Sequence, residues 1–255
     1  MSITAENLTV HRLGRPVLRD VSLRIGEGDC ICVIGPNGAG KSSLMAALLG
    51  LLPVSDGAVL MDGTPICRLS RRAIARRVAY VPQIHEGYMG FRVREIVESG
   101  RYAYLDPLDS LSEEDRRAIG EAVEACRIET LLDRPLDTLS GGERQKVWIA
   151  AALAQQTSML FLDEPTNALD PAHQAELIRI MRGFLAAGKT LLVICHDLNL
   201  PLMLGGRVLA LREGQAVFAG PVEDLLDTDR LRDIFHTDFV THHATDGHKS
   251  VQLKL

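Results

Sequence analysis

The sequence has no excess of positive charge. Its 28 lysine and arginine residues are outnumbered by 33 aspartate and glutamate residues, which gives a formal net charge of −5 and a pI near 5.9. Proteins that bind nucleic acid or an anionic membrane surface through charge carry a basic patch or stripe. The composition gives no sign of such a patch, and we expect no nucleic-acid partner.

Long apolar runs are also absent. A membrane-spanning helix needs roughly 18 or more consecutive apolar residues. No run here approaches that length, and runs such as Leu191–Cys195 have the length of a buried strand. The opening segment MSITAENLTVHR contains no apolar core of the kind that secretory signals carry. We therefore expect a cytoplasmic protein.

Cysteine is scarce, and its five copies are an odd number. A chain of 255 residues with 46% hydrophobic and 24% charged residues can bury an ordinary core without disulfides, as one large domain or one domain with an inserted lobe. This usage fits a reducing compartment. Cys30 and Cys32 alternate in an apolar segment before a glycine-rich loop, so we predict buried thiols there.

Short apolar segments bounded by glycine, aspartate or proline predict strands at Ile3–Val10, Asp29–Ile34, Ala58–Met61, Val78–Val81, Met159–Leu162, Thr190–Cys195, Arg207–Leu211 and Gln215–Phe218. Several are continuous apolar runs (CICVIG, MLFLD, TLLVICH), as expected for parallel strands covered on both faces. Helical patterns lie between them at Lys41–Leu51, Val147–Gln155 and Ala172–Ala187. Strands alternating with helices predict an α/β layered fold.

Two other regions differ from this alternation. The stretch from about Phe91 to Asp137 is mostly helical in pattern and predicts a helical lobe inserted into the α/β core. The stretch from about 226 is polar and predicts a solvated tail or small terminal domain. Four histidines lie in this stretch: His236, His242, His243 and His248. No cysteine or acidic residue is spaced to complete a metal-coordination set with them. The arginine pairs at 71–72 and 76–77 predict a solvated helix face.

The segment GPNGAGKS, residues 35–42, follows the apolar strand CICVI and opens the helical run SLMAALLG. This strand–loop–helix context is that of a phosphate-binding loop. Backbone N–H groups and the helix dipole bind phosphates in such loops. Lys41 is placed to reach the β- and γ-phosphates, and Ser42 to ligate Mg²⁺.

The segment MLFLDE, residues 159–164, is an apolar strand that ends in two acids. Strand alternation directs Asp163 and Glu164 to opposite sides, so that Asp163 can support Mg²⁺ and Glu164 can polarise water as a general base. Two acids at a strand end also fit a solvated turn, but a phosphate loop upstream favours catalysis. His196, after TLLVIC, and Gln83, after AYVP, each fit a structural role when considered alone.

The segment LSGGERQ, residues 139–145, has a second notable helix start. Ser140 and Glu143 have capping-box spacing, yet Gly141 and Gly142 occupy the first turn, where each glycine costs up to about 1 kcal/mol relative to alanine. Glycines at a helix start often indicate that a phosphate approaches bare backbone. No lysine is placed here to hold one.

Together these motifs resemble those of ATP-binding cassette ATPases, the motor subunits of ABC transporters. GPNGAGKSS is similar to the Walker A loop, MLFLDEP to the Walker B strand, LSGGERQ to the family signature and NALD (167–170) to the D-loop. Gln83 matches the Q-loop residue and His196 the switch histidine. The resemblance implies a catalytic set of Glu164, His196, Gln83 and Lys41, and a Mg²⁺ set of Ser42, Gln83 and Asp163.

The resemblance also implies the fold. We expect a P-loop NTPase core with a mixed sheet, an antiparallel β subdomain and an inserted helical subdomain, in a single nucleotide-binding domain over residues 1–255. The RecA-like core is expected at about 1–90 and 141–225, the helical subdomain at about 91–140, and a C-terminal tail at about 226–255.

In this family two cassettes pack head to tail around ATP, which implies a homodimer with composite sites. One subunit's phosphate loop would hold the ATP, through Gly35, Pro36, Asn37, Gly38, Ala39, Gly40, Lys41, Ser42 and Ser43. The partner's signature would contact the γ-phosphate, through Ser140, Gly141 and Gly142. Cassettes usually stack an aromatic residue on adenine. The segment THRLGRPVL offers His11 and Arg12 but no such residue. Arg12 is the predicted stacking group, with His11 as the alternative.

The resemblance covers the whole chain and is greatest for importers of iron-siderophores, haem and cobalamin, through VREIVESG, RPLDTLSGGERQ and CHDLNL. It implies permease partners, a periplasmic substrate-binding protein, and a position on the inner face of the cell membrane. A soluble cassette ATPase of cofactor assembly and an importer of zinc, manganese or molybdate stay open as alternatives. A P-loop kinase or GTPase is excluded by LSGGE and His196 together.

Overall fold

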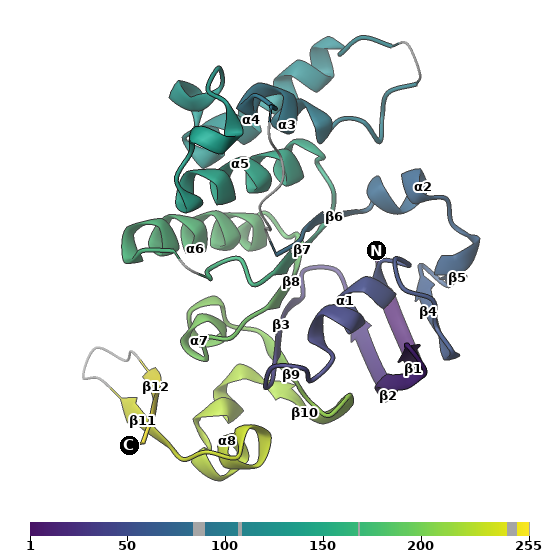
Figure 1. The fold of residues 1–255 in the computed structure, drawn as a ribbon, viewed down its shortest axis with the longest axis vertical. Helices are drawn as coiled ribbons and strands as arrows, with labels where there is room; N and C mark the ends of the chain where they lie inside the picture. The colour runs from purple at the N-terminus through teal and green to yellow at the C-terminus, as the bar shows by residue number, and fades with distance from the viewer. Residues whose placement is uncertain (84–89, 107–108, 168, 244–248, 255) are drawn as a thin grey trace. The chain divides into compact units, whose positions relative to one another are not determined.

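The computed structural model describes residues 1–83, 90–106, 109–167, 169–243 and 249–254. The chain divides into two compact units. The first comprises Met1–Arg68 and Thr190–Leu255, and the second comprises Leu69–Lys189; Figure 1 follows both along the chain by colour. The second unit is longer than the helical subdomain expected at about 91–140, whose boundaries stay a prediction.

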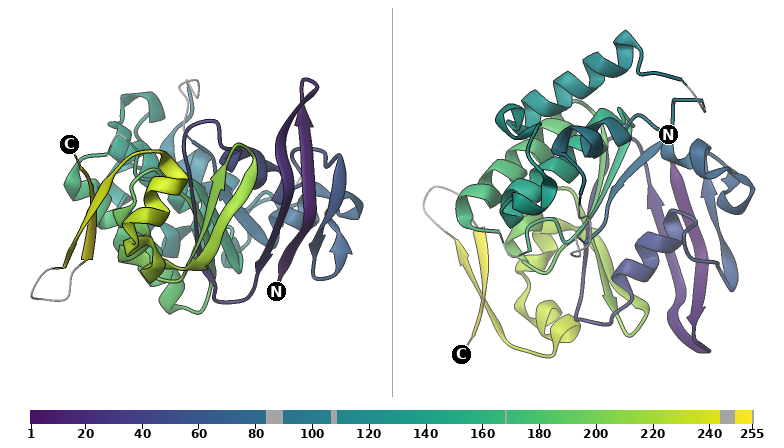
Figure 2. Two further views of the ribbon diagram at one scale, coloured as in Figure 1. Left: turned by 90° about the horizontal axis from the view of Figure 1, so that it is seen from below. Right: turned by 45° about the horizontal axis from the view of Figure 1, so that its top comes forward.

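The first unit contains an antiparallel sheet with the strand order β2-β1-β4-β5. Its strands are β1 (Ile3–Arg12), β2 (Arg15–Ile25), β4 (Asp56–Met61) and β5 (Thr64–Pro65). Buried and exposed residues alternate along β2, because one face of the sheet packs on the core. Figure 2 shows β1 and β2 as a long hairpin. The antiparallel β subdomain is confirmed, although β2 itself was not predicted.

A second set of strands in this unit is mostly parallel. β3 (Cys30–Ile34) lies between β8 (Thr190–Ile194) and β9 (Arg207–Arg212) and runs parallel to both, while β10 (Gln215–Pro221) pairs antiparallel with β9. Every residue of β3 and β8 is buried, as their continuous apolar sequences predict. Cys30 and Cys32 are buried, which confirms the prediction for these thiols.

The last part of the first unit is folded and is not a loose polar tail. It contains α7 (Asn199–Leu204), η4 (Val222–Leu226), α8 (Thr228–Phe235), β11 (Phe239–His243) and β12 (Lys249–Leu253); the short η1 (Ile66–Arg68) lies earlier in the unit. Val251 of β12 is buried, and its backbone N–H and C=O both bond to the Asn199 side chain, at 2.9 and 3.2 Å. His248 lies outside the described residues. Among those described, no group of three or more His, Cys, Asp or Glu is placed to hold a metal ion.

The second unit combines two parallel strands with a group of helices. The strands are β6 (Val78–Val81) and β7 (Met159–Asp163), and the helices are α2 (Arg71–Ala75), α3 (Val93–Ser99), α4 (Glu113–Cys126), η2 (Glu129–Leu131), η3 (Leu136–Thr138), α5 (Gly141–Ala154) and α6 (Pro171–Ala186). Both α3 and α4 pack on α5. No helix of the described residues has the length and apolar character needed to cross a membrane.

A buried ion pair ties α4 to the end of α5. The Arg101 side chain, 4% exposed, donates to the Asp115 carboxylate at 2.7 Å and to the Ala154 carbonyl at 2.9 Å. Its guanidinium lies 4.1 Å from the ring centroid of Tyr104. Hydrogen bonds from Ser112 lower the pKa of Asp115 to about 2, with a further contribution from Arg101 and against the opposing effect of burial. The carboxylate is therefore charged throughout the physiological range.

The prediction of a solvated arginine face is incomplete, because Arg72 is half-buried and Arg76, although exposed, is also hydrogen-bonded. Arg72 donates to the carbonyls of Ala103 and Leu105 at 2.8 and 2.7 Å and pairs with Asp106 at 2.7 Å. Arg76 donates to the same Ala103 carbonyl at 2.8 Å. A guanidinium presents five donors in a rigid fork, which suits the carbonyls of the irregular segment after α3. These arginines bind the segment to α2.

Candidate active site

The predicted phosphate loop connects β3 to α1 (Lys41–Leu48) in the first unit. Gly35 has a φ of 142°, and a Cβ there would clash with the Leu211 carbonyl. Gly40 has a φ of 100°, and a Cβ there would lie 2.6 Å from the Val17 carbonyl oxygen. The loop can therefore adopt this path only with glycine at these two positions. Asn37, Gly38 and Ser42 are exposed along its outer surface.

Lys41 supports the same loop from within. Its side chain is 6% exposed, and its Nζ donates to the carbonyls of Gly35 and Pro36 at 2.8 and 3.1 Å. The first turn of α1 contains no acidic residue, and Gly40 gives it no side-chain cap. A lysine ammonium and the positive end of a helix thus stand together at a glycine loop, which is the arrangement that binds phosphate.

His196 lies at the same edge of the sheet as the phosphate loop. β3 and β8 are parallel neighbours with Val33 opposite Ile194, and Cys195 N–H donates to the Val33 carbonyl at 3.1 Å. His196 is the next residue and is exposed. The carboxyl edge of parallel strands is where ligands bind in such folds. A contact between His196 and the γ-phosphate stays a prediction.

Arg12 lies beside the tip of the β1–β2 hairpin. It pairs with Arg15 across the turn formed by Leu13 and Gly14, which have φ values of 52° and 75°. Its side chain is exposed. The β2 strand also lines the phosphate loop, since Gly40 packs against Val17. A base contact by Arg12 stays a prediction.

In the second unit, the parallel strands β6 and β7 end side by side, with Val81 opposite Leu162. Gln83 follows β6 and Glu164 follows β7. The Gln83 amide donates to the Glu164 carboxylate at 3.0 Å, so the structure brings these two predicted residues together. The same carboxylate accepts from the side-chain amide of Asn167 at 3.5 Å.

The two acids at the end of β7 have different environments. Asp163 is 5% exposed, whereas Glu164 is half-buried. Burial, together with the negative charge of Asp163, raises the pKa of Tyr80 to about 12. Glu164 has a φ of 51°, a left-handed conformation that non-glycine residues rarely adopt. It also precedes Pro165, where the α regions are disfavoured.

The predicted signature forms the start of α5. Ser140 is the N-cap, and its capping box is complete: Ser140 N–H and Oγ donate to the Glu143 carboxylate at 2.8 and 2.9 Å, and Glu143 N–H donates to Ser140 Oγ at 3.3 Å. These bonds lower the pKa of Glu143. A Cβ at Gly141 would meet nothing within 4 Å, so no contact within the described chain explains that glycine.

Gly142 differs from Gly141 because a side chain there would meet another residue of the same chain. The sequence interpretation did not include this contact. A Cβ at Gly142 would lie 2.6 Å from Cγ and Cδ2 of the His173 ring. The ring Nδ1 lies 2.7 Å from an oxygen of Asp170, and the His173 N–H donates to the other oxygen at 3.0 Å. Hydrogen bonding from His173 lowers the pKa of Asp170. Gly142 thus has a reason within its own chain to be glycine.

His173 was not predicted from the sequence. It lies on α6, three residues after Asp170, the N-cap of that helix and the last residue of NALD; Ala168 of that motif lies outside the described residues. One turn further along the same two helices, Lys146 of α5 donates to Glu176 of α6 at 2.9 Å. His173 and Lys146 therefore hold the predicted signature helix against the helix that follows the predicted D-loop.

The fold is that of a P-loop nucleoside triphosphatase, with its phosphate loop on a β3–α1 connection and two acids at the end of β7. The ABC transporter family model matches residues 18–167. The chain is 36% identical to the achromobactin transport ATP-binding protein of Dickeya dadantii (strain 3937) over 93% of its length and 88% of the relative's. The chain belongs to the ABC transporter family, as one of its ATP-binding ATPases.

Further similar proteins are also ATP-binding proteins of transport systems. The iron(3+)-hydroxamate import ATP-binding protein of Bacillus subtilis (strain 168) is 36% identical over 93% of this chain and 88% of its own. The hemin import ATP-binding protein of Pseudomonas fluorescens (strain Pf0-1) is 38% identical over 96% of this chain and 97% of its own. A dimeric bacterial ABC transporter cassette superposes with a TM-score of 0.76 at 26% identity, covering 86% of this chain and 98% of its own.

Proposed function

We propose that this chain is the ATP-hydrolysing motor of a bacterial ABC importer for iron-siderophores, haem or a similar metal chelate such as a corrinoid. The observation that carries the cargo class is the set of relatives at 36–38% identity over more than nine-tenths of the chain, whose names are those of achromobactin, iron-hydroxamate and hemin systems. The contact between Gln83 and Glu164 supports the hydrolytic function.

Each of the predicted site residues has a separate function in ATP hydrolysis. Lys41 and the phosphate-loop N–H groups bind the β- and γ-phosphates, and His196 contacts the γ-phosphate. Glu164 accepts a proton from the attacking water, and Gln83, bonded to it at 3.0 Å, orients its carboxylate. Hydrolysis takes place in a homodimer, in which Ser140 and Gly141 approach the nucleotide that the partner binds.

The donor chemistry also fits Mg²⁺. Ser42, Gln83 and Asp163 offer hydroxyl, amide and carboxylate oxygens, which are the hard ligands that Mg²⁺ prefers alongside phosphate oxygens. Bound Mg²⁺ would neutralise charge that develops on the transferred phosphate. Asp163 is buried beside Tyr80, so its carboxylate is held in place before the metal binds.

The permease is proposed to dock on the segment Phe91–Tyr104 of the second unit. Phe91 and Tyr102 are 50% and 66% exposed, so both present apolar surface on this segment. A cytoplasmic helix of a permease subunit would cover them. Two copies of this chain would join two permease subunits on the inner face of the membrane, supplied by a periplasmic substrate-binding protein.

The test is reconstitution with the permease encoded beside it. Wild-type chain should co-purify with that permease in detergent, and in liposomes its ATPase should rise when binding protein loaded with ferric siderophore, haem or cobalamin is added. Glu164→Gln should bind ATP with near wild-type affinity but lose at least 95%, roughly twentyfold, of hydrolysis and all uptake.

Matched Glu176→Gln, also on the second unit but paired with Lys146, should keep most activity. Near wild-type hydrolysis by Glu164→Gln would remove the general-base assignment. If only zinc, manganese or molybdate stimulated the ATPase in liposomes, the cargo would be that ion and not a metal chelate. Purification with soluble partners alone would favour an ATPase of cofactor assembly.

A further inference from the structure

A cavity of about 350 Å³ lies within the second unit, outside every predicted motif of the ATPase. The ends of α4 and α5 and the middle of α6 line it. Cavities of this size hold small organic molecules. Its lining residues include Cys126, buried with a thiol pKa raised to about 12 by burial, so this sulfur is a neutral apolar group and not a reactive one.

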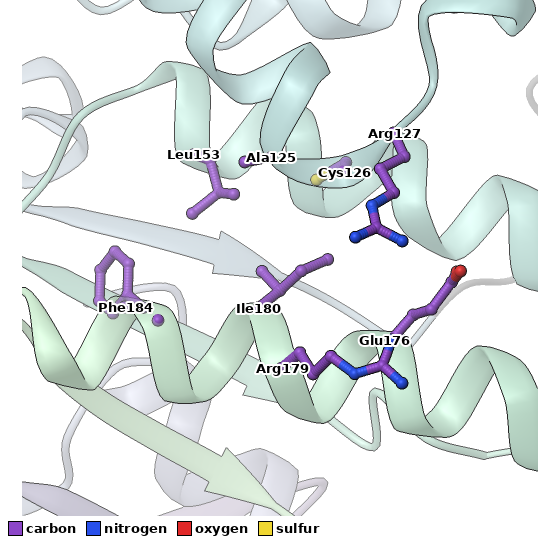
Figure 3. A pocket seen from close by; sticks show the side chains of 9 residues that line it. Ala125, Cys126, Arg127, Leu153, Glu176, Arg179, Ile180 and Phe184 are labelled. Atoms are coloured by element: carbon purple, nitrogen blue, oxygen red, sulfur yellow. The ribbon is translucent and has the colours of Figure 1, made fainter.

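The cavity has two chemically different ends. Figure 3 shows Leu153 and Phe184 at one end, with Ile180 projecting from α6 between them and the polar end, where Arg127, Arg179 and Glu176 gather. Glu176 already binds Lys146 at 2.9 Å, and this bond lowers its pKa. Among the described residues, neither arginine side chain takes part in a hydrogen bond or ion pair. Arg127 also helps to lower the pKa of Glu176, so one carboxylate faces two arginines and the polar end keeps a net positive charge.

Arg127 is held over this cavity by an unfavourable backbone conformation. It caps the C-terminus of α4 with φ 54° and ψ 53°, a left-handed position where glycine is the usual residue. A residue with a side chain strains the backbone there. Its side chain extends from the end of α4 toward α6 (Figure 3). The strained backbone of Arg127 directs its positive charge into the cavity. This indicates that the charge has a function there.

We infer that this cavity binds a small amphiphilic carboxylate. Its carboxylate would be bound by the Arg127 and Arg179 guanidinium groups, which form paired hydrogen bonds to carboxylate oxygens. Its apolar body would lie over Ile180 toward Leu153 and Phe184. The binding does not depend on the proposed transport activity, and it would place a ligand one turn beyond the Lys146–Glu176 contact between α5 and α6.

The probe is octanoate, titrated by calorimetry into the full chain. We expect saturable binding of one equivalent with a dissociation constant below roughly 1 mM. Octanol carries the same apolar body without charge, and acetate carries the charge without the body, so each should bind at least tenfold more weakly. Octanol binding as tightly as octanoate, or no saturable octanoate binding up to about 10 mM, would overturn the proposal.

Two variants test the site without unfolding it. Arg127→Gly removes one cation and relieves the left-handed strain, so the chain should be as stable as wild type while octanoate binds at least tenfold more weakly. Gly183→Leu fills the cavity, since a Cβ at Gly183 meets nothing within 4 Å, and should abolish binding. Gly120→Leu is the control: a glycine of α4 with equally open space, outside the cavity. Equal octanoate affinity in Gly183→Leu and Gly120→Leu would exclude this site.

Discussion

Gly142 and Gly141 stand next to each other in one helical turn, yet different constraints act on them. The His173 ring fills the space where a side chain at Gly142 would go, whereas the space beside Gly141 is open. A glycine with open space loses helix stability for no gain within the described chain. A phosphate that approaches the bare backbone therefore accounts better for Gly141 than for Gly142.

Alanine at each position should separate these two constraints. Gly142→Ala should lower the free energy of unfolding by about 1–3 kcal/mol, because the methyl group displaces the His173 ring. Gly141→Ala should leave it equal or raise it by up to about 1 kcal/mol through helix propensity, while lowering ATPase activity. Thermal unfolding followed by circular dichroism measures the first effect, and steady-state hydrolysis measures the second.

A double variant serves as the control for this explanation. Adding His173→Ala to Gly142→Ala removes the ring that the methyl group meets, so the double variant should recover stability relative to the sum of the single changes. If Gly142→Ala proves as stable as Gly141→Ala, the packing argument is wrong.

The predictability of the site differs between residues. The sequence could place Lys41, Glu164 and His196 after strands of the core, because a continuous apolar run precedes each of them. His173 could not be placed in this way, since its contact with Gly142 is made across two helices about thirty residues apart in sequence. Its spacing of three residues from the helix-capping Asp170 was the available signal.

Among the helical elements, the junction of α4 with α5 depends on the charge of Asp115. The pKa of this carboxyl is lowered from 3.8 to about 2 in the folded chain. A depressed pKa stabilises the fold above the unfolded value, and this contribution is lost as the pH falls from about 4 toward about 2. Arg101 would be left buried and without its carboxylate.

Asp115→Asn should therefore lower the free energy of unfolding by about 3 kcal/mol at pH 7. The difference from wild type should be constant from pH 8 to 5 and shrink below pH 4. Urea unfolding at each pH measures it. The exposed Asp133, which pairs with Arg94 at 3.1 Å, gives the control: Asp133→Asn should cost less than about 1 kcal/mol. A difference for Asp115→Asn that stays unchanged at pH 3 would contradict this account.

Whether a strand could be predicted from the sequence depends on its pattern of buried and exposed residues. β3, β7 and β8 were predicted because all their residues are buried and all but Asp163 and Thr190 are apolar. β2 was missed because it begins with exposed polar residues and pairs with β1 through three register shifts that interrupt alternation. Within the part of the chain that the structure describes, β11 and β12 pair only with each other. They show little apolar pattern, so their sequence was interpreted as a polar tail.

For the whole molecule, the proposed composite site would use two chains, and crosslinking tests this proposal directly. Asn37 is exposed on the phosphate loop, and Gly141 has room for a side chain, unlike Gly142. In a Glu164→Gln background with the exposed Cys67 replaced by serine, we mix Asn37→Cys and Gly141→Cys chains and add a short bis-maleimide.

ATP should produce a crosslinked species of twice the chain mass on a denaturing gel, because nucleotide draws the two chains together. Gly120→Cys, exposed on α4, replaces Gly141→Cys in the control and should give no such species. A crosslink whose yield is the same with and without ATP, or no crosslink at all, would argue against a nucleotide between two chains.

The left-handed backbone of Glu164 affects how this chain can evolve. A non-glycine residue with a φ of 51° before a proline holds of order 1–3 kcal/mol of strain, a noticeable share of the stability of a domain. Glycine would release that strain at once and remove the proposed general base with it. Selection for heat resistance and selection for turnover therefore favour different residues at this position. A thermostable descendant chosen without an activity screen would be expected to lose its carboxylate here early.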